Sequence, residues 1–172
     1  MRAAVVTVSD RSFRGERPDA SGPVLKQLLE GSGAHVADVR IVPDAPDRII
    51  STLIALADEL ACDVILTTGG TGLSPRDTTP EATARVIEKR LPGMEAALLQ
   101  ESLKRTPYAM LSRGIVGVRG RTLIVNLPGS PKAVKECFAV VQPVLAHAVK
   151  LLRDEDPYAA SHPGSPLQEV SS

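Results

Sequence analysis

Three short apolar runs alternate with helix-like segments in the N-terminal part of the chain, and this alternation restricts the fold more than any other feature. The runs cover residues 2–9, 35–42 and 63–68, and they are rich in valine, isoleucine and threonine, which suit buried strands. Between them, residues 21–33 and 49–60 carry apolar side chains at helical spacing. A βαβαβ order with buried strands predicts a parallel sheet that is covered by helices on both faces.

The rest of the chain continues this pattern. We expect helices over residues 80–90 and 93–105, a hairpin or two strand segments over residues 115–125, and a long helix over residues 132–153. The predicted fold class is therefore α/β, with three αβα layers and a mostly parallel central sheet.

Length and composition predict a single domain. A chain of 172 residues can bury roughly 70% of its unfolded surface, which is enough for a core without disulfides or metals. We place the domain at residues 1–153. Residues 154–172 are rich in proline, serine and acidic residues and poor in apolar ones, so we expect a disordered C-terminal tail.

Charge and composition argue against several classes of function. Lys+Arg and Asp+Glu both total 20, and only four aromatic residues are present, so we do not expect nucleic-acid binding. The three histidines and two cysteines lack ligand spacing, so any metal should be bound by oxygen. No apolar run approaches ~18 residues and no signal-peptide pattern is present, so we expect a cytoplasmic protein with no membrane contact.

The strongest functional signal is the segment of residues 67–83, which reads Thr-Thr-Gly-Gly-Thr-Gly-Leu-Ser-Pro-Arg-Asp-Thr-Thr-Pro-Glu-Ala-Thr. Its glycines allow sharp turns and close approach of a ligand, and its consecutive amides can surround an anion. No Walker lysine follows Gly72, and Pro75 stands where a dinucleotide fingerprint requires a third small residue. The segment predicts a phosphate site of a different kind.

Two aspartates should meet at this site. Asp44 and Asp77 follow predicted strands about one βαβ unit apart, so both can lie at the carboxyl edge of the sheet. Paired carboxylates beside an amide-lined loop suit hydrated Mg²⁺, and Arg76 could stabilise charge that develops on a transferring phosphate. The alternatives are that Asp44 only shapes a turn or caps a helix, and that Asp77 only accepts hydrogen bonds from nearby amides.

Two further loops leave predicted strands at the same edge. Ser9 and Asp10 follow the first strand, and residues 126–131 follow a later one, although the first could be a solvated loop and the second a turn with a helix entry. With Asp44 and Asp77 as catalytic residues and Mg²⁺ ligands, the candidate substrate-binding residues are Ser9, Asp10, Thr68, Gly69, Gly70, Thr71, Gly72, Ser74, Arg76, Thr79, Pro80, Glu81, Asn126, Pro128, Gly129 and Ser130.

At these residues the chain resembles the molybdopterin adenylyltransferase family, the MogA and MoaB group that also includes the G domain of gephyrin. The resemblance is carried by Thr-Thr-Gly-Gly-Thr-Gly at 67–72 and by Arg-Asp-x-Thr-Pro-Glu-Ala at 76–82. Val-Ser-Asp-Arg at 8–11, Pro-Asp at 43–44 and Asn-Leu-Pro-Gly-Ser-Pro at 126–131 match its other loops in order. The similarity covers about residues 3–150.

The resemblance implies a function. Members of the family are usually trimers, and they bind molybdopterin and Mg-ATP, transfer AMP to the terminal phosphate of the pterin and release pyrophosphate. The product then goes to a molybdenum-insertion enzyme of the same pathway. The two functional aspartates of the family correspond to Asp44 and Asp77. The alternatives are a non-catalytic molybdopterin carrier like some MoaB proteins and a scaffold domain like that of gephyrin.

Overall fold

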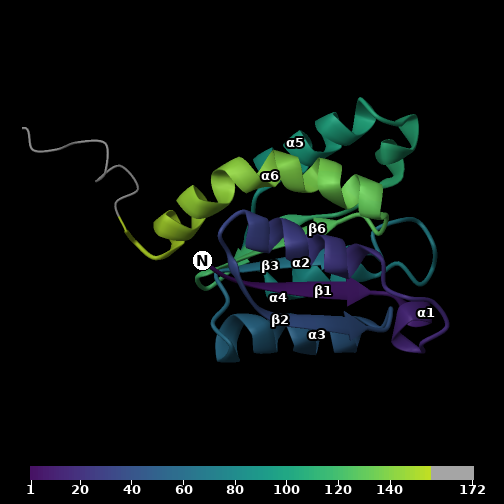
Figure 1. Ribbon diagram of the computed structural model, residues 1–172, viewed down its shortest axis with the longest axis horizontal. Coiled ribbons are helices and arrows are strands. Elements are labelled where there is room, and N and C mark those ends of the chain that lie inside the picture. Colours follow the sequence, from purple (N-terminus) through teal and green to yellow (C-terminus); the bar gives the residue numbers. More distant parts are fainter. Residues whose placement is uncertain (156–172) are drawn as a thin grey trace, which may run out of the picture.

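The computed structural model describes residues 1–155, and it contains a six-stranded sheet with the order β2-β1-β3-β6-β5-β4 (Figure 1). The strands are β1 (Arg2–Val8), β2 (His35–Val42), β3 (Val64–Thr68), β4 (Lys89–Arg90), β5 (Val116–Arg119) and β6 (Thr122–Leu127). β2, β1, β3 and β6 pair in parallel, whereas β5 is antiparallel to both β6 and β4. The predicted α/β fold with a mostly parallel sheet is confirmed.

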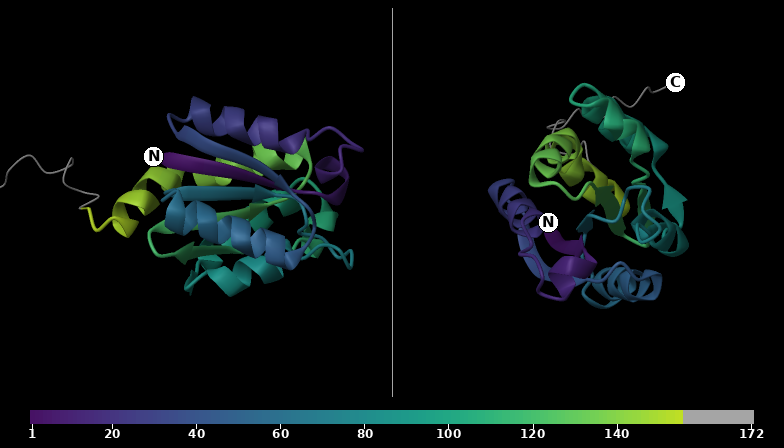
Figure 2. Two further views of the ribbon diagram at one scale, coloured as in Figure 1. Left: turned by 90° about the horizontal axis from the view of Figure 1, so that it is seen from below. Right: turned by 90° about the vertical axis from the view of Figure 1, so that its right-hand side faces the viewer.

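The helices form a layer on each face of this sheet (Figure 2). They are α1 (Asp10–Phe13), α2 (Ser21–Gly31), α3 (Pro46–Ile54), α4 (Thr79–Val86), α5 (Pro92–Leu103) and α6 (Pro131–Leu152), with a π-helical turn η1 (Ala55–Glu59) and a 3₁₀ helix η2 (Pro107–Leu111). α2 and α6 cover one face and α3 and α4 cover the other, while α5 packs against α6.

The β1 strand shows why the sheet needs both layers. Ala3 and Val5 belong to the core beneath α2 and α6, whereas Ala4, Val6 and Val8 belong to the core against α3 and α4. All five side chains are at most 2% exposed. A strand with alternating residues buried on both faces is stable only between two helical layers.

One predicted helix is wrong over its last four residues. We expected a helix over residues 80–90, but α4 ends at Val86 and Ile87 is extended. Lys89 and Arg90 instead pair with Val118 and Gly117 of β5 as the edge strand β4. The free edge of β5 offers backbone partners to these residues, and this tertiary pairing overrides their local helix preference. The helices η2 and α1 were not predicted.

The structure describes the predicted end of the domain but only the first two residues of the predicted tail. α6 ends at Leu152, and the amides of Asp154 and Glu155 bond to carbonyls at its end. The tail prediction for residues 156–172 lies outside the described residues. Within residues 1–155, no helix is both long enough and apolar enough to cross a bilayer.

The topology gathers four loops at one edge of the sheet. Thr68 of β3 pairs with Thr7 of β1 on one side and with Leu127 of β6 on the other, so these strands end side by side. The loop after β2 joins them, because the Ser9 amide bonds to the Val42 carbonyl at 2.9 Å. All the loops that we selected from the sequence therefore leave the same carboxyl edge.

Candidate functional site

The loop between β3 and α4, residues 69–78, requires glycine at its start. Gly69 and Gly70 have φ angles of 96° and 63°, in the left-handed region that side chains disfavour. A Cβ on Gly69 would collide with the Val8 carbonyl, and a Cβ on Gly70 would collide with the Thr79 hydroxyl. Thr79 closes this glycine loop, because its Oγ1 donates to the Gly69 carbonyl at 3.0 Å and its amide to the Gly70 carbonyl at 3.1 Å.

Asp77 folds back toward the glycines of this loop. Its Oδ2 accepts a hydrogen bond from the Ser74 amide at 2.9 Å, rather than from the amides of Thr78 and Thr79. A Cβ on Gly72 would lie 2.9 Å from the same Oδ2. The absence of a side chain at Gly72 therefore allows the Asp77 carboxylate to occupy its position.

Asp10 and Asp44 hold each other in place. The Asp10 amide donates to Asp44 Oδ2 at 2.7 Å, and the Asp44 amide donates to Asp10 Oδ1 at 3.0 Å. Arg76 also donates two hydrogen bonds to Asp10, with Nε 2.9 Å from Oδ2 and Nη2 3.1 Å from Oδ1. Asp44 does not cap α3, whose N-cap is Ala45. These contacts bring the loops after β1, β2 and β3 into one cluster.

The cluster carries more negative charge than positive charge. Burial raises the pKa of Asp44, and the nearby charges of Asp10 and Asp77 raise it further. The hydrogen bond from the Asp10 amide and the charge of Arg76 lower this pKa, but by less. Burial also tends to raise the pKa of Asp10, but the hydrogen bonds from Arg76 and from the Asp44 amide, together with the Arg76 charge, bring it below its usual value. The site therefore holds a carboxylate that a cation would stabilise.

The donor set fits Mg²⁺ rather than a metal held by many side chains. No group of three or more His, Cys, Asp and Glu residues suited to a metal occurs within residues 1–155. Mg²⁺ keeps several waters and takes only one or two carboxylates plus substrate phosphates. Asp44 Oδ1 lies next to Gly70 and Asp77 Oδ2 lies next to Gly72, so both carboxylates border the same short stretch of the loop.

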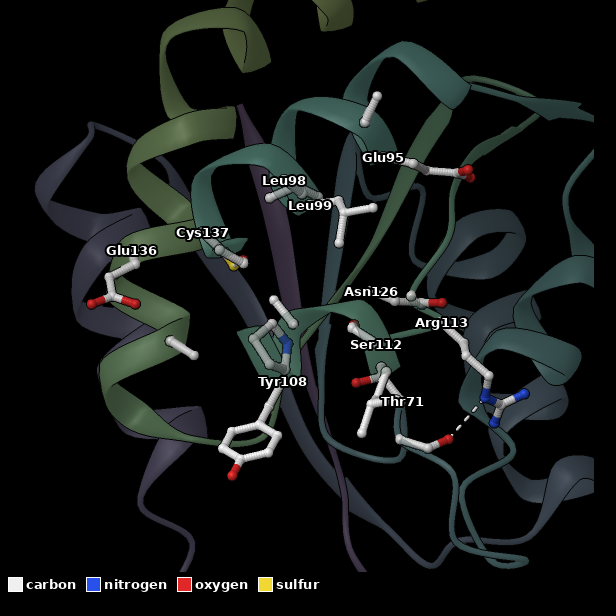
Figure 3. A pocket seen from close by; sticks show the side chains of 18 of the residues that line it. Thr71, Glu95, Leu98, Leu99, Tyr108, Ser112, Arg113, Asn126, Glu136 and Cys137 are labelled. Carbon is white, nitrogen blue, oxygen red and sulfur yellow. Dashed lines mark hydrogen bonds between the residues drawn. The ribbon is translucent and has the colours of Figure 1, made fainter. Parts of the chain in front are cut away.

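Two cavities flank the glycine loop. One, which we name the polar cavity, has a volume of about 770 Å³ and includes Ser9, Asp44, Gly69 and Gly70. The other, the apolar cavity, has a volume of about 640 Å³ and reaches from Gly72 to α5, η2 and α6 (Figure 3). Its lining includes Ala96, Leu98, Leu99, Ala109, Leu111 and Cys137. The glycine loop contributes to both.

The predicted residues at the end of β6 and directly after it mainly support the site. Asn126 uses both its amide hydrogens on Thr67 and Thr83, each at 3.0 Å, and its Oδ1 accepts from the Ile115 amide at 3.2 Å. The Pro128 carbonyl accepts from Thr68 Oγ1 at 2.8 Å, and Gly129 and Ser130 line the polar cavity.

The remaining predicted residues lie at helix starts. Ser9 and Ser130 cap α1 and α6 through their hydroxyls, Pro80 is buried in the first turn of α4, and Glu81 forms an ion pair with Arg113. The structure also adds residues that the sequence did not indicate. Arg17 and Asp19 line the polar cavity, and Arg113 contacts the glycine loop. No motif or spacing distinguishes these three residues from surface residues.

Comparison with known proteins identifies the family. Residues 4–147 match the family described as "Probable molybdopterin binding domain". The chain belongs to this molybdopterin-binding family. It is 48% identical over 152 residues to the molybdenum cofactor synthesis protein cinnamon of Drosophila melanogaster, which covers 88% of this chain but only 25% of cinnamon. It is 41% identical to a molybdopterin adenylyltransferase of Helicobacter pylori, over 86% of this chain and 85% of that protein.

Solved structures agree in both sequence and fold. The molybdopterin biosynthesis enzyme MoaB of Thermus thermophilus superposes with a TM-score of 0.84 at 47% identity, covering 90% of this chain and 97% of that one. A MogA structure gives a TM-score of 0.84 at 40% identity, covering 88% and 99% of the two chains. The predicted family is confirmed, and the chain falls within molybdenum cofactor biosynthesis. The prediction of a nucleotidyltransferase agrees with the relatives that are named molybdopterin adenylyltransferase.

Proposed function

We propose that this chain is a Mg²⁺- and ATP-dependent molybdopterin adenylyltransferase, which transfers AMP to molybdopterin and releases pyrophosphate. The observation that carries this proposal is the position of Asp44 and Asp77 beside a glycine loop that separates a polar cavity from an apolar one. Two substrates that react through their phosphates need such an arrangement, with a common phosphate site and separate room for the rest of each molecule.

The reaction needs positioning more than proton transfer. A terminal phosphate oxygen of molybdopterin attacks the α-phosphorus of ATP, and the bond to the bridging oxygen of pyrophosphate breaks. A phosphate at pH 7 is already ionised, so no general base is required. The protein's task is to bring the two phosphates into line and to stabilise charge on the transferring group.

The glycine loop and the aspartates are suited to that task. Gly69 and Gly70 line the polar cavity. The Gly69 amide donates to the Leu127 carbonyl at 3.2 Å, so the amides that follow it in the loop would bind phosphate oxygens. Asp44 and Asp77 would hold Mg²⁺, which neutralises phosphate charge when it is bound. Of the Asp44 carboxylate, Oδ2 accepts from Asp10, whereas Oδ1 faces Gly70, at the start of the loop.

Arg76 would change partner during this reaction. Its side chain is 61% exposed and is paired with Asp10 at the mouth of the site. An exposed ion pair contributes only about 0–1 kcal/mol, so a phosphate that carries more charge can displace Asp10 from the guanidinium. Arg76 would then bind the transferring group while Asp10 keeps its bond to the Asp44 amide.

The apolar cavity would take a ring system. Its mostly apolar surface, with a few polar groups, and its volume of about 640 Å³ suit a planar heterocycle, and the cavity reaches the glycine loop at Thr71 and Gly72. We propose that the ring of one substrate lies here while its phosphate reaches the loop. The family resemblance adds three further proposals: a homotrimer, a cytoplasmic location and transfer of the product to a molybdenum-insertion enzyme.

The alternative is a molybdopterin carrier that does not react with ATP. It is favoured by the Thermus MoaB structure, which superposes with the same TM-score as MogA and at higher identity. One experiment separates the two functions. Purified protein is mixed with ATP, Mg²⁺ and molybdopterin, and pyrophosphate and adenylylated pterin are measured. The enzyme predicts pyrophosphate that requires molybdopterin, whereas a carrier binds the pterin and releases none.

A further inference from the structure

Arg113 lies at the junction of the apolar cavity and the glycine loop, and nothing in the sequence pattern points to it. It follows η2 and precedes β5, and it contributes to the cavity lining beside Thr71 (Figure 3). Its side chain is 33% exposed, so most of it is packed against the protein. An arginine that is largely packed needs partners for its donors.

Arg113 contacts the loop at three places and the helix after it at a fourth. Its amide donates to the Thr71 carbonyl at 3.0 Å, its Nε to the Gly72 carbonyl at 2.8 Å and its Nη2 to the Asp77 carbonyl at 2.7 Å. Its Nη1 forms an ion pair with Glu81 in the first turn of α4. These contacts extend from Thr71 and Gly72 to the helix that follows the loop.

Apart from Thr79, which closes the two ends of the loop on each other, the remaining support of this loop is local or exposed. Ser74 and Asp77 bond to each other across a turn, and Arg76 reaches out to Asp10 from a side chain that is 61% exposed. The ion pair between Arg76 and Asp10 would be lost during the reaction if Arg76 is released as proposed. Arg113 would then be the main connection between the Asp77 segment and the rest of the domain.

We infer that Arg113 is a positioning residue, which fixes the main chain at Gly72 and Asp77 so that the Asp77 carboxylate reaches Mg²⁺ and the reacting phosphates. This inference rests on the proposed function. Three nitrogens of one planar guanidinium serve three acceptors in different directions, whereas the lysine ammonium is a single point. Lysine therefore cannot replace arginine here, even though it keeps the charge.

Arg119 provides a matched control. It also joins a carboxylate to a backbone carbonyl near a helix end, since Nε lies 2.9 Å from Asp58 Oδ1 and Nη1 lies 3.2 Å from the Val86 carbonyl. Its side chain is 25% exposed, and neither cavity includes it. The Arg119→Ala variant therefore shows how the loss of one such bridging arginine affects the fold when neither cavity is changed.

The test compares Arg113→Ala, Arg113→Lys and Arg119→Ala with the wild type. We measure kcat and KM for pyrophosphate release, and Mn²⁺ affinity by electron paramagnetic resonance with a non-hydrolysable ATP analogue present. We expect Arg113→Ala to lower kcat ~10²-fold, with KM for ATP changed less than ~3-fold and Mn²⁺ bound ~10-fold more weakly. Arg113→Lys should resemble it, and Arg119→Ala should match the wild type in both readouts.

Two outcomes would overturn the inference: full rescue by Arg113→Lys, or Arg113 variants whose kcat and Mn²⁺ affinity equal those of Arg119→Ala. If Arg113→Ala does not fold, the kcat and Mn²⁺ affinity of Arg113→Lys alone support or overturn the inference. If the wild type itself releases no pyrophosphate, the proposed function fails, and Mn²⁺ affinity alone then supports or overturns the positioning role.

Discussion

The polar and apolar cavities both include residues of the glycine loop, and they are otherwise formed mainly by different elements. The polar cavity is formed by loops at the carboxyl ends of β1, β2, β3 and β6, and hydroxyls, backbone groups, Arg17, Asp19 and Asp44 line it. The apolar cavity is formed mainly by α5, η2 and the start of α6, and its surface is mostly apolar although arginines and glutamates also contribute to it. Figure 3 shows Leu98, Leu99, Tyr108 and Cys137 around it.

This difference indicates that two parts of the fold serve two functions in a two-substrate reaction, namely binding of phosphate and binding of a ring. In a parallel α/β sheet the carboxyl ends of the strands bring loops together, so that edge supplies anion binding. Room for a ring requires apolar side chains, and these come from helices added beside the sheet. The predictions that follow alter one side of the loop at a time.

The largest effect should come from the charged side. Asp77→Ala should reduce turnover at least ~10²-fold, equivalent to about 3 kcal/mol, because it removes a group that positions the metal and the phosphates. Steady-state pyrophosphate release measures this loss. The control is Asp47→Asn, because Asp47 is exposed in the first turn of α3.

The double variant Asp44→Ala, Asp77→Ala tests whether both aspartates hold one Mg²⁺. If they do, its loss of turnover will be far smaller than the sum of the two single losses. Near-normal turnover in Asp77→Ala would refute the role.

A smaller loss should follow when Asp77 is displaced but kept. In Gly72→Ala, the new Cβ would lie 2.9 Å from Asp77 Oδ2 and push the end of that side chain away. The φ angle of Gly72 is not in the left-handed region, so the fold should be little affected. We expect kcat ~10-fold lower, with a melting temperature close to that of Gly93→Ala, where a Cβ meets open space. Unchanged kcat would show that the carboxylate position is not critical.

Gly70 offers the contrast within the same loop. Its φ of 63° and the collision of a Cβ with Thr79 Oγ1 make any side chain there strained. We expect Gly70→Val to weaken ligand binding and also to lower the free energy of unfolding by about 1–3 kcal/mol. Calorimetry alongside thermal melts checks both. Normal binding by this variant would mean that the loop is only a structural turn.

On the apolar side, one side chain can be added without disturbing the core. Ala96 on α5 is exposed and lines the apolar cavity, whereas its neighbour Ala97 is exposed and does not line it. Ala96→Phe should raise KM several-fold, about 5- to 10-fold, for one of the two substrates while Ala97→Phe changes neither. Equal effects on ATP and molybdopterin, or none, would contradict the assignment of a single ring to this cavity.

The smallest effect concerns stability rather than activity. Burial and the charges of Asp10 and Asp77 raise the pKa of Asp44, so ionised Asp44 is less favourable in the folded state than in the unfolded one. This cost is absent below the unfolded pKa of about 4 and grows as pH rises through the folded pKa. Without metal, Asp44→Asn should therefore melt slightly higher than the wild type at pH 7, and the gap should close near pH 4. A variant that melts lower at pH 7 would contradict this.

The sequence predicts the parallel half of the molecule well. The strands β1 and β3 are apolar and buried on both faces, and glycines and prolines mark the helices, so local pattern and tertiary position agree there. The expectation of a buried strand is wrong for β2, because β2 lies at the edge of the sheet and only Val42 in it is buried. The same holds for the glycine loop, where Thr79 and Pro80 begin α4 as expected. The carboxyl-edge rule then brings Asp44 and Asp77 together without knowledge of any side-chain contact.

The rest depends on contacts between distant residues. Lys89 and Arg90 become a strand only because β5 leaves an edge open, and no local signal records this. Arg113 lies 41 residues from the Gly72 carbonyl to which it donates, and Asp10 lies 66 residues from Arg76. Such pairs obey no periodicity, so the sequence made Asp10 a candidate binding residue with a solvated loop as the alternative, and it gave no role to Arg113.

A structure of the complex with Mg²⁺ and a non-hydrolysable ATP analogue tests the central claim most directly. We predict that phosphate oxygens accept hydrogen bonds from amides of the glycine loop, and that Mg²⁺ bridges them to Asp44 or Asp77. The triphosphate should lie where the polar and apolar cavities meet. A nucleotide bound with its phosphates away from this loop, or a Mg²⁺ that contacts neither aspartate, would contradict the account.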